Sequence, residues 1–343
     1  MAQISIGHTG ITAEQNGFGA LPIQRIPKAD AVSLLRRAYD GGITYFDTAR
    51  SYTDSEEKLG QAFGEGGLRD KITIATKTHA QDAKTFWEHL ETSLRLLKTD
   101  HIDVYQFHNP AFCPKPGDES GLYDAILEAK KQGKILHIGI TNHRLKVAHE
   151  AIDSGLYETL QYPFSYLSTP EELALVESCT ESGMGFIAMK ALSGGLIVNS
   201  AAACAWLCRY KNVVPIWGIQ RRWELEEFLS YIPTPPMLTP ELEAVIRKDR
   251  AELQGEFCRG CGYCMPCPMG IEISTCARAS LLMRRAPTSQ ILSPEGQAKM
   301  RKIPDCIGCR QCAAKCPYGL DTPNLLKRNY QDFLEVLAGK SVE

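Results

Sequence analysis

The feature that most constrains this chain is an alternation of short apolar segments with amphipathic ones over roughly its first two-thirds. Eight segments have the length and composition of strands, near residues 17–21, 43–47, 71–77, 102–108, 135–141, 159–164, 185–190 and 213–219. The intervening segments have helical periodicity, and Thr169-Pro170-Glu171-Glu172 has the pattern of a capping box at a helix start. A repeat of this kind forms either a closed (β/α)8 barrel or an open, doubly wound sheet.

Polar residues at the ends of these segments favour the barrel. The residues concerned are Asp47, Lys77, His108, Thr141 with Asn142, Gln161 and Lys190. A closed barrel gathers all its strand C-terminal ends at one mouth. An open sheet usually binds a dinucleotide at a G-x-G-x-x-G turn, and no such turn follows any of the eight segments. We therefore predict an α/β protein with a (β/α)8 TIM barrel over residues 1–232, starting with a short hairpin at 3–14.

Composition excludes several classes of function. The 343 residues are 44% apolar and 23% charged, with a net charge of −2, which gives no reason to expect nucleic acid as a partner. The chain has no run of about 18 apolar residues, and its first residues do not read as a signal peptide, so no membrane association is expected. We expect a cytoplasmic protein whose thiols stay reduced.

A proline-rich linker at 233–240 precedes a second domain, 241–343, in which cysteines are concentrated. Nine of the chain's 13 cysteines lie between Cys258 and Cys316, and clustered cysteines in a reducing compartment indicate metal binding. Two runs stand out, Cys258-x2-Cys261-x2-Cys264-x2-Cys267-Pro268 and Cys306-x2-Cys309-x2-Cys312-x3-Cys316-Pro317. The second is the full bacterial ferredoxin pattern, and the first is one residue shorter before its fourth cysteine.

The two runs predict two [4Fe–4S] clusters. In two-cluster ferredoxins the fourth cysteine of each run serves the other cluster. We predict one cluster on Cys258, Cys261, Cys264 and Cys316 and the other on Cys306, Cys309, Cys312 and Cys267, with Cys276 as the alternative to Cys267. Structural zinc is less compatible, because zinc sites usually take cysteines in separated pairs. Whether the clusters transfer electrons or only stabilise the domain is left open.

The predicted barrel mouth contains the groups that carbonyl reduction needs. Tyr52 can donate a proton to the developing alkoxide, and a nearby ammonium would make it a better acid, which is the role predicted for Lys77. Asp47 would hold Lys77 by a charge-assisted hydrogen bond, and His108 would orient the substrate oxygen. Any one of these residues could be purely structural. Four complementary groups at three successive strand ends predict a site.

These residues and their surroundings resemble the aldo/keto reductase family. The matching stretches are Gly42 to Tyr52 (GITYFDTARSY), Ser55 to Gly60 (SEEKLG), Ala75-Thr76-Lys77 and Asp103 to His108 (DVYQFH). The whole chain is similar to the branch that carries a C-terminal two-cluster, helical ferredoxin-like domain. The resemblance implies that Asp47, Tyr52, Lys77 and His108 are the family's catalytic tetrad.

The resemblance also implies an NADP or NAD site across the barrel mouth. Thr141, Asn142 and Gln161 match the residues that contact the nicotinamide carboxamide in the family. Met189 and Lys190 stand where many members have an aromatic residue that stacks on the nicotinamide. Ser193 and Gly194 could offer backbone N–H groups to the pyrophosphate. Gly218, at the end of the last strand, and Gln220 and Arg222 just after it are also expected to bind the cofactor. There the family's usual Arg and Asn for a 2′-phosphate are replaced by Glu224 and Phe228, which leaves the choice of nucleotide open.

Three functional hypotheses follow. The first is hydride transfer between a nicotinamide and a small carbonyl or alcohol, with two clusters for electron transfer. The second is a reductase fed by the clusters without nicotinamide, and the third is a non-catalytic redox-sensing or binding subunit. An external electron-transfer protein is a possible partner, and the identity of the substrate is not readable.

Overall fold

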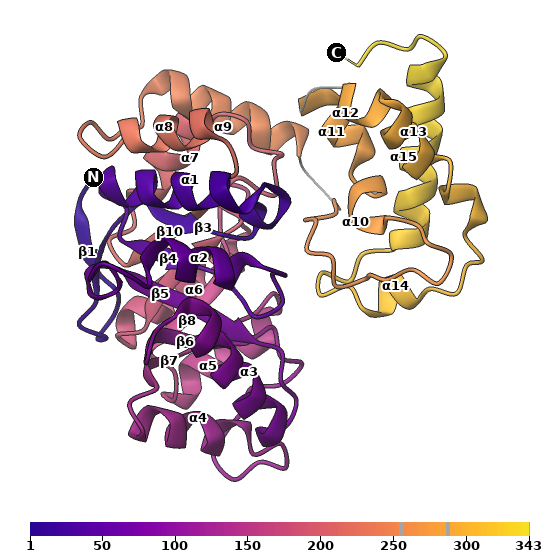
Figure 1. Ribbon diagram of the computed structural model, residues 1–343. Helices are drawn as coiled ribbons and strands as arrows, with labels where there is room; N and C mark the ends of the chain where they lie inside the picture. Colours follow the sequence, from indigo (N-terminus) through magenta and orange to yellow (C-terminus); the bar gives the residue numbers. More distant parts are fainter. Residues whose placement is uncertain (254–256, 286–288, 343) are drawn as a thin grey trace. The chain divides into compact units, whose positions relative to one another are not determined.

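The computed structural model describes residues 1–253, 257–285 and 289–342, and the chain divides into two compact units (Figure 1). The first contains Met1–Ala191 and Ala201–Thr239. The second contains Leu192–Ser200 together with the chain from Pro240 onward. The proline-rich linker at 233–240 therefore groups with the first unit except for Pro240. The assignment of Leu192–Ser200 to the second unit was not predicted.

The first unit is a closed barrel of eight parallel strands, which confirms the predicted fold. The strands are β3 (Gly17–Gly19), β4 (Tyr45–Asp47), β5 (Thr73–Thr78), β6 (Ile102–His108), β7 (Ile135–Thr141), β8 (Thr159–Pro163), β9 (Gly185–Met189) and β10 (Val213–Gly218). Each pairs with the next, and β10 closes on β3. The register pairs His108 with Thr141 and Thr141 with Gln161, so these three polar residues lie side by side at the C-terminal end of their strands.

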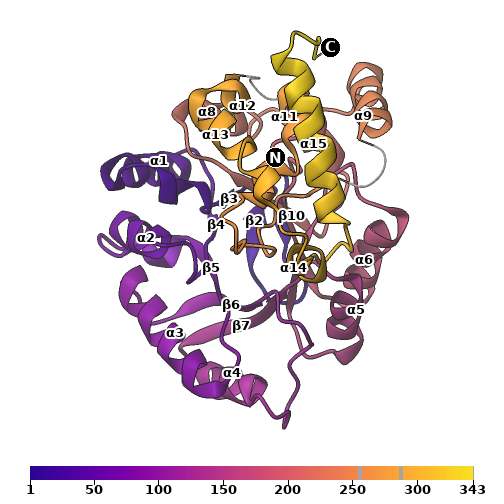
Figure 2. The same ribbon diagram turned by 90° about the vertical axis from the view of Figure 1, so that its right-hand side faces the viewer.

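Helices surround the strands (Figure 2). They are α1 (Lys28–Asp40), α2 (Ser55–Phe63), α3 (Ala83–Leu97), α4 (Leu122–Lys131), α5 (Leu145–Ser154), α6 (Pro170–Glu181), α7 (Ser200–Leu207) and α8 (Arg222–Ser230), with 3-10 turns at Pro22–Arg25 and Arg69–Lys71. In α3 the predicted apolar stripe of Phe86, Leu90, Leu94 and Leu97 is buried. The predicted capping box starts α6, where Thr169 accepts from Glu172 N and Glu172 reaches back to Thr169 N.

An antiparallel hairpin of β1 (Gln3–Ser5) and β2 (Thr12–Glu14) precedes the barrel, as predicted. Its apolar residues Ile4, Ile6 and Ala13 form one buried cluster with residues of the barrel strands. The strand residues in that cluster are Tyr45, Ala75, Val104, Ile187, Val214 and Ile216. Tyr45 is the first residue of β4, and Asp47 is the last. The hairpin therefore fills the barrel from the strand beginnings and leaves the C-terminal mouth to the polar residues.

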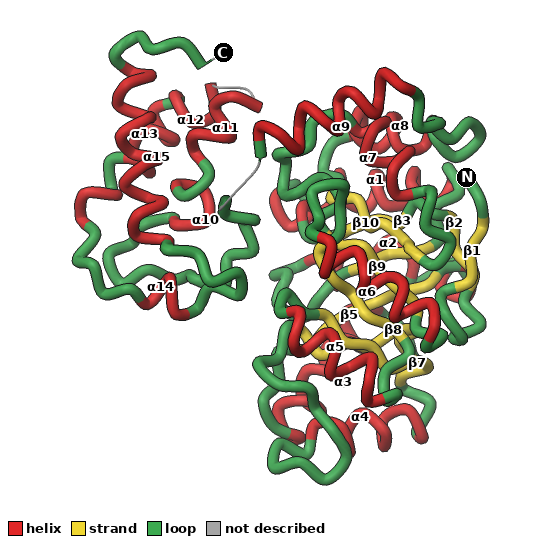
Figure 3. Tube along the Cα trace, turned by 180° about the vertical axis from the view of Figure 1, so that it is seen from behind, coloured by secondary structure: helices red, strands yellow, loops and turns green. Residues whose placement is uncertain are grey.

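The described part of the second unit contains helices and turns only (Figure 3). Its elements are α9 (Pro240–Glu252), α10 (Ile273–Cys276), α11 (Ala279–Arg285), α12 (Ser289–Leu292), α13 (Pro294–Met300), a 3-10 turn at Ile303–Asp305, α14 (Gln311–Ala314) and α15 (Thr322–Leu337). A small core around Ile271, Met283, Leu326 and Phe333 holds them together, and several cysteines pack against it. None of the described helices has the length and apolar character of a membrane span.

Candidate active site and cluster-binding segments

The mouth of the barrel holds a buried ion pair between Asp47 and Lys77. Lys77 Nζ lies 2.6 Å from Asp47 Oδ1 and donates a second hydrogen bond of 2.5 Å to the carbonyl oxygen of Thr48. The side chains of Lys77 and Asp47 are 0% and 3% exposed, so the pair is removed from water. The side-chain amides of Gln106 and Gln161 also face Asp47, with nitrogen–oxygen distances of 3.5 and 3.4 Å. The carboxylate is thereby held in a fixed position.

Tyr52 lies beside this pair, in the loop between β4 and α2. The Lys77 ammonium is 5.2 Å from the centre of the Tyr52 ring, and the His108 ring meets the tyrosine edge-on with centroids 5.8 Å apart. Backbone hydrogen bonds from Tyr52 N to Ala49 O and from Ser55 N to Tyr52 O fix the loop. The structure therefore brings together all four residues predicted as the tetrad.

Burial determines the protonation behaviour of these groups. It raises the pKa of Asp47, while the Lys77 ammonium acts in the opposite direction, and it lowers the pKa of Lys77, with Asp47 again opposing. Burial also lowers the pKa of His108 well below its usual value, and positive charge on His79, Lys77 or His143 would lower it further. His108 is therefore a neutral imidazole at pH 7, able to donate from one ring nitrogen and accept at the other.

His79 is a residue of this site that sequence reasoning missed. It follows β5 directly, and its ring is stacked on that of His108, with centroids 3.9 Å apart and planes at 18°. Burial lowers the pKa of His79 also, although a hydrogen bond with the His108 backbone opposes this. The stacked pair fixes the plane of the His108 ring. Its position two residues after Lys77 was visible in the sequence, but nothing local distinguishes it from an ordinary surface histidine.

The residues predicted to contact a carboxamide have different surroundings. Among the described residues, Gln161 Oε1 and His108 Nδ1 are buried without a hydrogen-bond partner. In the described part of the chain, Tyr45, Gln106 and Thr159 on the barrel strands also have unpaired polar atoms, so these two atoms are available to a ligand without identifying one. The Asn142 side chain, in contrast, has hydrogen-bond partners within the protein. It donates to Pro110 O and accepts from His143 N and Arg144 N, and these bonds stabilise the loop after β7. Thr141 lies 3.8 Å from the Met189 sulfur.

Hydrogen bonds and ion pairs of side chains on α8 stabilise the segment after β10. Glu224, at the position of the family's arginine, accepts from Gln220 N and Arg221 N and so caps α8. Arg222 is paired with Glu226, which also binds Arg37. Phe228, at the position of the family's asparagine, stacks on Trp217 with ring centroids 4.4 Å apart. Gly218, at the end of β10, is exposed. Glu224 and Phe228 therefore have structural roles here, in capping α8 and in packing against Trp217.

The residues after β9 include Lys190, Ser193 and Gly194, all with positive φ. Lys190 still groups with the barrel, whereas Ser193 and Gly194 lie in Leu192–Ser200 and group with the second unit. The structure thus separates the predicted nucleotide contacts into two sets. One lies at the strand ends of the barrel and the other in a segment that packs with the cysteine-rich unit.

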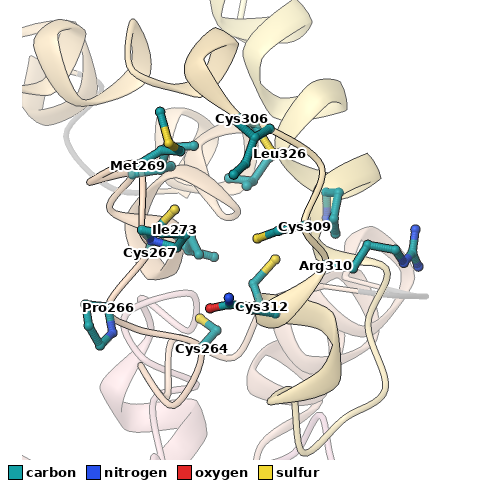
Figure 4. A pocket seen from close by; sticks show the side chains of 15 residues that line it. Cys264, Pro266, Cys267, Met269, Ile273, Cys306, Cys309, Arg310, Cys312 and Leu326 are labelled. Carbon is teal, nitrogen blue, oxygen red and sulfur yellow. The ribbon is translucent and has the colours of Figure 1, made fainter.

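The cysteines line two pockets in the second unit. Cys258, Cys261, Cys264 and Cys316 line one of them. Cys267, Cys306, Cys309 and Cys312 line the other, which Cys264 also borders (Figure 4). Each predicted set of four thiols therefore faces one pocket, as a cluster held by four cysteines requires.

Cys276, the alternative to Cys267, lines neither pocket. It is fully buried, and its sulfur lies 3.5 Å from the carbonyl oxygen of Lys299. Its side chain belongs to the apolar core of the second unit. The placement of the two side chains favours Cys267 as the fourth ligand, despite the short spacing before it.

Comparison with known proteins agrees with both units. The model of the aldo/keto reductase family matches residues 13–202, and that of a 4Fe-4S dicluster domain matches residues 257–321. The chain is 30% identical over 217 residues to aldo-keto reductase YhdN of Bacillus subtilis, covering 58% of this chain and 64% of that protein. It is 31% identical over 197 residues to 6-dehydroglucose reductase of Novosphingobium aromaticivorans, covering 52% and 62%.

A solved structure shares the fold. The aldo-keto reductase AKR11C1 from Bacillus halodurans superposes with a TM-score of 0.63 at 20% identity, covering 73% of this chain and 96% of that one. The two curated relatives match over less than two-thirds of their own length. The chain belongs to the aldo/keto reductase family of oxidoreductases, and residues 257–321 match an iron–sulfur domain of the 4Fe-4S dicluster type.

Proposed function

We propose that the barrel transfers a hydride between NAD(P)H and a small carbonyl or alcohol, and that the second unit holds two [4Fe–4S] clusters for electron transfer. The observation that carries the proposal is the buried Asp47–Lys77 pair with the Lys77 ammonium 5.2 Å from the centre of the Tyr52 ring. A binding subunit has no use for a buried ion pair directed at a phenol. The nicotinamide, when bound, supplies the hydride.

In this proposal Tyr52 gives its proton to the carbonyl oxygen as negative charge develops there. Lys77 stabilises the phenolate that remains, and Asp47 keeps the ammonium charged despite its burial. Neutral His108 donates to the same oxygen and orients the carbonyl, while its stack on His79 prevents the ring from rotating. Gln161 Oε1, unpaired among the described residues, suits the N–H of a carboxamide.

The test is Tyr52→Phe, assayed with NADPH and NADH against a panel of small aliphatic and aromatic aldehydes. Losing a general acid lowers kcat by roughly 10²- to 10⁴-fold. Tyr39→Phe is the matched control, because Tyr39 lies on α1 and packs edge-on against Phe63 away from the tetrad. Full activity in Tyr52→Phe would refute the role of the phenol. Iron content should equal that of the wild type in both variants.

The second candidate function is reduction fed by the clusters without nicotinamide. It is favoured by the structural roles of Glu224 and Phe228, which occupy the positions where many relatives bind the 2′-phosphate. Anaerobic titration with NADPH and NADH separates the two candidates. Tight binding of either nucleotide excludes the second candidate, and no binding of either excludes the first.

A further inference from the structure

The segment Leu192–Ser200 is anchored by an arginine from the cysteine-rich part of the chain. Arg278 Nη1 donates a 2.7 Å hydrogen bond to the carbonyl oxygen of Gly194, and its Nε donates a 3.0 Å bond to the carbonyl oxygen of Ser274. Both partners belong to the second unit, as does the segment itself. The guanidinium thus connects Leu192–Ser200, the segment that follows β9 in the chain, with α10 of the cysteine-rich unit.

The same guanidinium lies against the first cysteine run. Gly260 stands between Cys258 and Cys261, and a Cβ built on it would lie 2.7 Å from Arg278 Cζ. A Cβ on Gly194 would lie 2.8 Å from Arg278 Nη1. Both glycines have positive φ, of 61° and 67°, a backbone conformation that disfavours any other residue. The half-buried Arg278 guanidinium therefore lies against both glycines.

Charge makes this position significant. The Arg278 guanidinium lies beside Gly260, between Cys258 and Cys261, so negative charge on these sulfurs attracts it. One more negative charge on a cluster held there would attract the guanidinium more strongly. The hydrogen bond to Gly194 would weaken as the cation moves toward the sulfurs. A charge change at the first cysteine run would then change how Leu192–Ser200 is held.

We propose that Arg278 is a positioning residue that couples the redox state of the cluster on Cys258, Cys261, Cys264 and Cys316 to the conformation of Leu192–Ser200. The proposal rests on the part of the proposed function that places a cluster on these four thiols. Reduction loosens the segment. By linkage, a condition that holds the segment tightly makes the cluster harder to reduce by the same factor.

The first measurement is amide hydrogen exchange on the full-length protein under anaerobic conditions. The protein is compared as isolated, with oxidised clusters, and after dithionite has supplied one electron to each. Peptides covering 192–200 should exchange several-fold faster in the reduced protein, while peptides of α3 should not change. Equal exchange of 192–200 in the two states would overturn the coupling.

Two variants separate charge from geometry. Arg278→Gln removes both the charge and the guanidinium geometry, so the amides of 192–200 should exchange fast in the oxidised and in the reduced protein. The midpoint potential of the first cluster should fall, because a positive charge near it is lost. Arg278→Lys keeps the charge but not the planar fork, so the potential should stay near that of the wild type while the redox-dependent difference is lost. Arg284→Gln is the control, because Arg284 pairs with Asp332 in the same unit. Iron content is measured in all three, and a wild-type exchange difference in Arg278→Gln would refute the proposal.

Discussion

The buried Asp47–Lys77 pair makes a quantitative prediction about stability as well as activity. Lys77→Met removes the ammonium and leaves the Asp47 carboxylate, among the described residues, with the long amide contacts of Gln106 and Gln161. Breaking a buried ion pair from one side costs about 3–5 kcal/mol, because the remaining charge is uncompensated. Asp47→Asn with Lys77→Met leaves two neutral side chains of similar volume. The double variant should therefore recover most of that loss, although neither variant reduces carbonyls.

The assay is urea unfolding followed by tryptophan fluorescence. All four tryptophans, Trp87, Trp206, Trp217 and Trp223, lie in the first unit, so the signal reports on the barrel. With a urea dependence of about 2–3 kcal/mol per molar, the midpoint of unfolding of the single variant should lie roughly 1–2.5 M below that of the wild type. The reasoning is refuted if Lys77→Met unfolds with the wild type, or if the double variant is as unstable as the single one.

Two further predictions concern the clusters and pH. Cys267→Ser should lower the iron content well below the roughly eight atoms per chain that two clusters hold, whereas Cys276→Ser should leave it unchanged, because, of these two cysteines, only Cys267 lines a cysteine-lined pocket. Iron and sulfide analysis of anaerobically purified protein measures this. The reverse outcome would make Cys276 the ligand. Because the folded-state pKa of His108 is depressed, the unfolded chain binds the proton first, so the free energy of unfolding should fall as pH drops below about 6.5, by up to about 1.4 kcal/mol per pH unit. His108→Gln should flatten this decline relative to His149→Gln in urea titrations at pH 7.5, 6.5 and 5.5, and parallel declines would contradict it.

Much of the fold was determined by local patterns. The eight strands, the opening hairpin and the α6 capping box depend on the period of apolar residues and on caps within a few residues of each other. The four tetrad residues were identifiable because each stands at or just after a strand end, and closure of the barrel then brings the ends together. The cysteine runs were readable because cluster ligation fixes their spacing along the chain.

Other features depend on residues that are distant in sequence. His79 gains its role only by stacking on His108 from the neighbouring strand. Leu192–Ser200 groups with the second unit, where Arg278, far along the chain, donates to Gly194. The sequence predicted Cys267 as the fourth ligand with Cys276 as the alternative, and of these two only Cys267 lines one of the cysteine-lined pockets. Sequence periodicity reports which face of an element is buried, whereas the partner that covers it is chosen by three-dimensional packing. The sequence alone therefore determined the barrel, the tetrad and the iron–sulfur character, and the tertiary structure decided how a histidine, a loop and an arginine are placed around them.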